Sequence, residues 1–136
     1  MKKLLALAAL AALAACETPK VTRDEMDSVN YGPKPQYWQQ EIRNYLSLRL
    51  HDPKSAVIDF KSEPKQMFQR QVALDPQQHG WAVCAFVNDG KELKPMTFFI
   101  RNEKVVYANN DPDHQGFLFA EYAKRQCAEL GAPFKQ

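Results

Sequence analysis

The 136-residue sequence predicts one α+β domain, in which a helix precedes an antiparallel meander sheet of four or five strands and a second helix packs on that sheet. Apolar residues recur at helical spacing near residues 37–50 and again at 117–130. Between these segments lie short β-type runs that are separated by turn residues rather than by helices, which is typical of antiparallel pairing.

The first helix is expected from Tyr37 to Leu50. Trp38, Ile42 and Leu46 repeat at intervals that place them on one face, as an amphipathic helix requires. The helix is expected to end before Asp52-Pro53, a pair that favours a tight turn.

Five runs are then rich in strand-forming residues and bounded by turn residues. The predicted strands are Val57–Phe60, Met67–Leu74, Trp81–Val87, Met96–Ile100 and Val105–Ala108. The third run, WAVCAFV, is apolar at every position, so both of its faces should be buried, and it is the predicted central strand.

The last helix is expected from Phe117 to Leu130, with Asp113 as its N-cap and Gly131 just past its end. Its inward face should carry Phe119, Ala123, Cys127 and Leu130. On the central strand, Cys84 shares a face with Ala82 and Phe86, which is the face expected to be covered by this helix.

The N-terminus has the order of an export signal: Lys2 and Lys3, then an uncharged Leu/Ala run over 4–15, then Cys16. The run is far shorter than the about 20 residues needed to cross a bilayer. Leu13-Ala14-Ala15-Cys16 resembles the lipobox of bacterial lipoproteins at all four positions. The resemblance implies that the signal peptide, residues 1–15, is removed and that Cys16 becomes an acylated N-terminus.

In Gram-negative lipoproteins an Asp after the lipidated cysteine favours retention in the inner membrane, whereas this chain has Glu17. The resemblance therefore implies an anchor in the outer membrane, on its periplasmic side. The polar, proline-containing residues 16–35 should form a flexible linker, with docking of residues 31–33 on the domain edge as the alternative. The globular domain is then 36–131, followed by a tail, 132–136.

Three cysteines are an odd number for an exported protein. If Cys16 carries lipid, Cys84 and Cys127 remain as a pair, and an oxidising compartment favours a disulfide between them over two buried thiols. The formal net charge is +2, and Lys2 and Lys3 leave with the signal peptide. No basic surface is then left to indicate binding to nucleic acid.

A second resemblance covers about residues 31–88. The helix that leads into Asp52-Pro53-Lys54-Ser55-Ala56, and the later Cys84-Ala85-Phe86-Val87-Asn88, are similar to a family of small bacterial envelope proteins whose function is not established. That family often has Gly after the cysteine and a Gly- and aromatic-rich segment after the asparagine, where this chain has Ala85 and a charged stretch. The resemblance implies a fold and a compartment, but no activity.

Asp111, Asp113 and His114 are weak candidates for a metal site, because their oxygen-rich loop matches no calcium-loop spacing. His51, His79 and His114 have no zinc-ligand spacing, although a cluster in space stays open. The chain has neither a phosphate-binding loop nor a nucleophile elbow. We therefore expect neither an enzyme nor a cofactor.

The function favoured by these observations is that of a non-enzymatic lipoprotein, held at the membrane by lipid on Cys16, which binds another envelope protein. Phe117, Leu118 and Tyr122 form the candidate partner patch if they are exposed. Two alternatives stay open. One is a periplasmic module that binds a small ligand or metal ion, and the other is an immunity or inhibitor lipoprotein.

Overall fold

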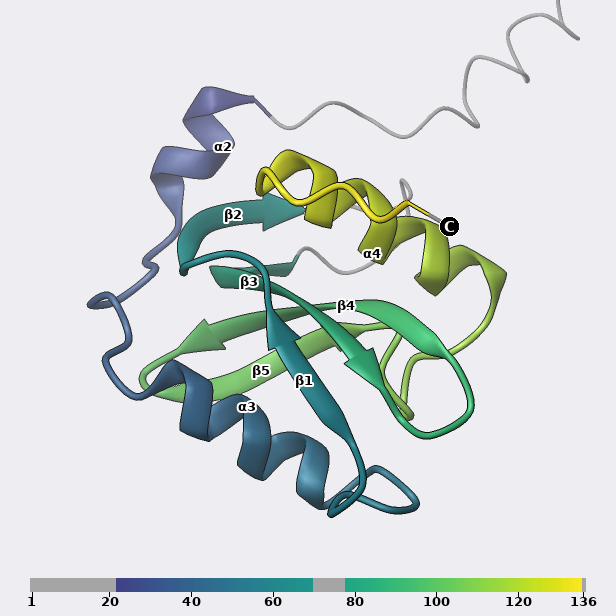
Figure 1. The fold of residues 1–136 in the computed structure, drawn as a ribbon. Coiled ribbons are helices and arrows are strands. Elements are labelled where there is room, and N and C mark those ends of the chain that lie inside the picture. The colour runs from purple at the N-terminus through teal and green to yellow at the C-terminus, as the bar shows by residue number, and fades with distance from the viewer. Residues whose placement is uncertain (1–21, 70–77, 136) are drawn as a thin grey trace, which may run out of the picture.

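A computed structural model describes residues 22–69 and 78–135, which form an α+β fold (Figure 1). The predicted fold class, a C-terminal helix packed on an antiparallel sheet, is confirmed. In chain order the elements are α2 (Arg23–Ser28), α3 (Trp38–Ser47), β1 (Val57–Phe60), β2 (Lys65–Gln69), β3 (Gln78–Asn88), β4 (Leu93–Arg101), β5 (Lys104–Asn109) and α4 (Phe117–Glu129).

The described strands form a five-stranded antiparallel sheet built around β3. Strands β3, β4 and β5 follow one another as a meander, as predicted. Strands β1 and β2 instead lie end to end along the other edge of β3, where Phe60 is opposite Ala85 and Lys65 is opposite Ala82. At the junction, the Cys84 amide donates to Ser62 Oγ (2.8 Å) and the Lys61 amide donates to the Cys84 carbonyl (2.8 Å).

The sheet separates two apolar cores, with α3 on one face and α4 on the other (Figure 1). Val83, Ala85 and Val87 of β3 face α3, which contributes the fully buried Ile42 and Leu46. Ala82 and Cys84 face α4. Every second residue of β3 therefore belongs to the same core, and its burial on both faces confirms the prediction of a central strand.

The segment before α3, which the sequence predicts to be a linker, contains a short helix, α2. Thr22 and Glu25 form a capping box that begins α2. Tyr31 is buried, and the indole nitrogen of Trp81 donates to the carbonyl oxygens of Tyr31 and Gly32, at 3.1 Å each. Tyr31 therefore docks on the edge of the domain, which is the alternative that the sequence left open for residues 31–33.

Helix α4 ends as predicted, since Gly131 has a left-handed φ of 86° and the Ala132 amide donates back to the Cys127 carbonyl at 2.9 Å. Within the predicted tail, the Phe134 ring packs edge-on against Phe86 with 5.0 Å between centroids. Strand β2 begins two residues before its predicted start, and residues 70–74 of that prediction lie outside the described part of the chain. Within the described ranges, no helix is long and apolar enough to cross a membrane.

Candidate functional site

A polar cluster joins α3 to the loop 110–116 that connects β5 with α4. Asp111 is completely buried, and its carboxylate accepts a hydrogen bond from the Tyr45 hydroxyl (2.6 Å). The other carboxylate oxygen lies 2.8 Å from His114 Nδ1, an arrangement in which the ring donates to the carboxylate. Burial, and then the hydrogen bond to Asp111, raise the pKa of Tyr45 above its usual value. The hydroxyl therefore stays protonated as a donor.

Arg49 closes this cluster on the solvent side. Its Nε donates to Asp113 (2.8 Å), one of its terminal nitrogens donates to the Tyr45 carbonyl (3.0 Å), and its guanidinium lies 3.6 Å from the centre of the Tyr45 ring. The His114 ring packs against Tyr107, with 4.8 Å between centroids. Each member thus has a structural partner, and the cluster fixes the loop on α3.

The three candidate metal ligands do not converge. Asp111 and His114 are in contact, but Asp113 turns away to Arg49. In the part of the chain that the structure describes, no three His, Cys, Asp or Glu side chains are arranged to hold a metal ion. His51 and His79 also lie in other surroundings, since His79 packs against Tyr31 and Phe68.

The predicted N-cap role of Asp113 is wrong. Helix α4 begins only at Phe117, with Gly116 before it and no side-chain cap. Asp113 instead lies in a separate turn, which the His114 amide closes on the Asp111 carbonyl (3.1 Å), and its side chain pairs with Arg49. Asn110 has the left-handed conformation expected of a turn asparagine, with φ of 66°.

The structure divides the predicted partner patch. Phe117 is 79% exposed and Leu118 is 59% exposed, whereas Tyr122 is only 8% exposed. Phe119, which was predicted to face inward, is half-buried. The candidate patch is therefore Phe117 and Leu118, on the first turn of α4.

The predicted disulfide joins Cys84 of β3 to Cys127 of α4, and both residues are completely buried. Beside it the buried Gln126 accepts hydrogen bonds from Thr97 (2.5 Å) and Asn109 (2.8 Å). Cys16, the predicted lipidation site, lies outside the described residues.

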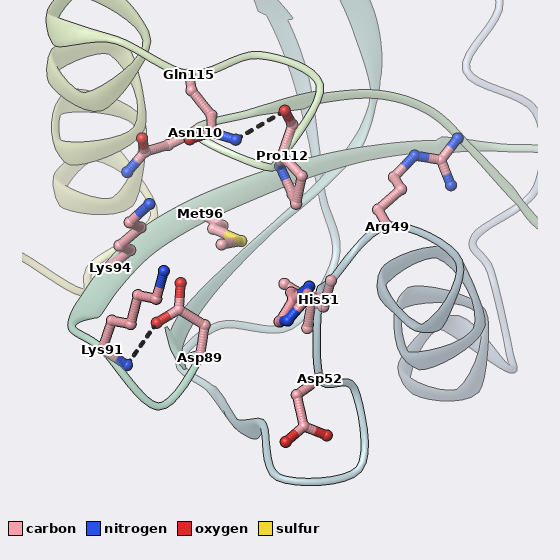
Figure 2. A pocket seen from close by; sticks show the side chains of 11 residues that line it. Arg49, His51, Asp52, Asp89, Lys91, Lys94, Met96, Asn110, Pro112 and Gln115 are labelled. Atoms are coloured by element: carbon pink, nitrogen blue, oxygen red, sulfur yellow. Dashed lines mark hydrogen bonds between the residues drawn. The ribbon is translucent and has the colours of Figure 1, made fainter.

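A cavity of about 240 Å³, here called the polar pocket, opens between the end of α3 and the β3–β4 hairpin (Figure 2). Asp89 lies at the hairpin and accepts hydrogen bonds from the amides of Lys91 (2.9 Å) and Glu92 (3.2 Å), which lower its pKa and keep it charged. The lining residues are Arg49, Leu50, His51, Asp52, Asp89, Lys91, Lys94, Met96, Asn110, Pro112 and Gln115.

A second cavity, of about 430 Å³, here called the apolar groove, lies between the same hairpin and the start of α4. Its walls include the exposed Phe117 ring, Leu93 and the ring of Phe134 from the C-terminal segment. The lining residues are Glu92, Leu93, Lys94, Pro95, Asn110, Gln115, Gly116, Phe117, Ala120, Lys124 and Phe134.

Sequence reasoning missed both cavities. Lys91 and Lys94 line the polar pocket and Leu93 lines the apolar groove, although the sequence marked this part of the chain only as a charged stretch. The one signal was an apolar residue, Leu93, in the middle of a charged hairpin. Comparison with known proteins adds no assignment, since no protein-family model, curated protein or solved structure matches the chain.

Proposed function

We propose that this protein is a non-enzymatic lipoprotein, anchored in the bacterial outer membrane through Cys16 and facing the periplasm, that binds another envelope protein. The observation that carries the proposal is the exposure of Phe117 and Leu118, two large apolar side chains on one helical turn, next to an open groove. Exposed apolar side chains that adjoin a groove are typical of a protein-interaction surface.

The position of this surface also supports the proposal. Figure 1 has α2, where the described chain begins, at the left of the domain, and the first turn of α4 at the right. A chain tethered by its N-terminus would therefore carry the apolar groove on the side away from its point of attachment. That side is accessible to a partner in the periplasm.

The test is photocrosslinking in cells, with a photoreactive phenylalanine analogue in place of Leu118. The matched control carries the analogue in place of Leu48, which is 83% exposed and lines neither cavity. We expect one dominant adduct from position 118 and none from position 48. Equal adducts from both positions, or none from position 118, would contradict a partner at this surface.

The anchor is tested in the same cells with Cys16→Ala. We expect this chain to lose acyl labelling and membrane association, and to lose the adduct from position 118 because the domain is no longer held near its partner. A Cys16→Ala chain that remains acylated and membrane-bound would contradict the anchor. Loss of the anchor with the adduct retained would show that the tether is not needed for binding.

A further inference from the structure

The polar pocket and the apolar groove adjoin each other, because Lys94, Asn110 and Gln115 line both cavities. The two together are here called the trough, and the two cavities are its polar and apolar halves. Resting on the proposed function, we propose that this trough binds an extended segment of the partner protein in which a large apolar side chain stands next to a carboxylate.

The apolar half determines the first part of this assignment. Phe117 is 79% exposed and Leu93 is 39% exposed, and both face the same groove as Phe134. Water around these side chains is released when an apolar side chain is buried between them, which favours binding. The groove is open to solvent on one side, as a trough for an extended segment is, whereas small-molecule sites enclose most of the ligand.

The polar half determines the second part. Its two acidic groups are occupied within their own turns, since Asp89 accepts from backbone amides and Asp52 accepts from the Ser55 hydroxyl. The Lys91 amine has no ion-pair partner within the described residues, and the His51 ring has no hydrogen-bond partner there. Lys94, at the junction of the two halves, makes a long contact to Glu92 (3.4 Å), and its charge helps to lower the pKa of the Asp89 carboxyl.

The Lys91 ammonium is a donor without an ion-pair partner among the described residues, so we expect the ligand to bring an acceptor for it. A carboxylate supplies two acceptor oxygens and a negative charge to Lys91 and Lys94. A polyanion does not fit as well, because Asp52, Asp89 and Glu92 are interspersed with the lysines and would repel it.

The experiment measures binding of the purified, anchor-free mature chain to an immobilised array of short peptides. The array contains four matched classes: Leu or Phe beside Glu, Leu or Phe beside Lys, Ser beside Glu, and Ser beside Lys. We expect the class with an apolar residue beside Glu to bind at least about tenfold more tightly than the other three.

Two pairs of variants locate the binding. Phe117→Ser should weaken binding by about tenfold, whereas Leu48→Ser, an equally exposed apolar position outside the trough, should leave it unchanged. In Lys91→Glu, the preferred peptides should change from those with an apolar residue beside Glu to those with an apolar residue beside Lys. The control is Lys104→Glu, at the exposed start of β5, which should leave the preference unchanged. A loss caused only by damage to the fold would not reverse the charge preference.

Equal binding to Glu and Lys classes, or an unchanged preference in Lys91→Glu, overturns the inference. So does concentration-dependent dimerisation that Phe117→Ser abolishes, because a second copy of the chain then occupies the trough. Binding to anionic lipid vesicles that Phe117→Ser and Lys91→Glu abolish assigns the trough to the membrane instead.

If crosslinking from position 118 traps a partner but the array shows no preference, the inference fails while the proposed function stands. If both experiments fail, both proposals fail.

Discussion

The Asp111 carboxylate holds together two segments that are far apart in sequence. It is completely buried, and its two oxygens contact Tyr45, from α3, and His114, from the loop before α4. A buried carboxylate with two partners is stabilised only while both remain. The cluster therefore fixes the loop that precedes Phe117, and with it one wall of the apolar groove.

Replacement of Asp111 by Ala should lower the free energy of unfolding by about 2–4 kcal/mol, because the part-buried Tyr45 hydroxyl and the His114 ring both lose their partner. Urea denaturation at neutral pH measures this change. The matched control is Asp113→Ala, which removes a partly exposed ion pair with Arg49 and should cost less than about 1 kcal/mol. Similar costs for the two variants would show that the buried contacts add nothing.

Helix α4 is attached to the sheet by apolar packing and by the Cys84–Cys127 disulfide. The bond closes a sequence separation of 43 residues that contains β4, β5 and most of α4. Crosslinking a loop of this length lowers the entropy of the unfolded chain.

In the double variant Cys84→Ala with Cys127→Ala, the free energy of unfolding should fall by about 4 kcal/mol. Denaturation of the wild-type chain with and without a reductant measures the same quantity independently. The reductant should destabilise the wild type and leave the double variant unchanged. A loss below about 1 kcal/mol in both comparisons would mean that packing alone holds α4.

Which elements could be predicted from the sequence depends on whether the signal is local. The strand Val57–Phe60 was predicted with its observed bounds, since turn residues flank it. The disulfide followed from counting cysteines and from the inward faces of β3 and α4. In contrast, the alternation of apolar and polar residues shows which side chains of a strand face the core, but not which strand lies beside it. The end-to-end placement of β1 and β2 along β3 could therefore not be predicted from this pattern.

The candidate site was harder to predict for a related reason. The trough is formed by the end of α3, the β3–β4 hairpin, the loop 110–116 and the C-terminal segment, which meet only in the fold. The exposure of Phe117 depends on where α4 begins, and the helix begins only after the turn that the His114 amide closes on the Asp111 carbonyl. Helical periodicity alone also placed Tyr122 in the patch, although this ring is buried.

At the scale of the whole molecule, the docking of Tyr31 and the presence of α2 bring the start of the described structure nearer to Cys16 than the predicted boundary at residue 36. If the chain is acylated at Cys16, six residue steps separate the lipid from Thr22 and can span at most about 20 Å. The β3–β4 hairpin and the first turn of α4, which contribute residues to the trough, lie across the domain from α2 (Figure 1). A domain held in this way presents α2 to the bilayer more often than it presents the trough.

This orientation can be measured with the acylated chain in lipid vesicles that carry a short-range fluorescence quencher on their head groups. A fluorophore attached through Ser28→Cys, on α2, should be quenched more strongly than one attached through Lys91→Cys, on the β3–β4 hairpin. Both positions are exposed, and the buried disulfide is inaccessible to the labelling reagent. The Cys16→Ala versions of both chains, which should not bind the vesicles, give the unquenched reference. Equal quenching at the two positions would mean that the domain tumbles freely on its tether. Stronger quenching at position 91 would mean that the trough faces the lipid, where a protein partner could not reach it.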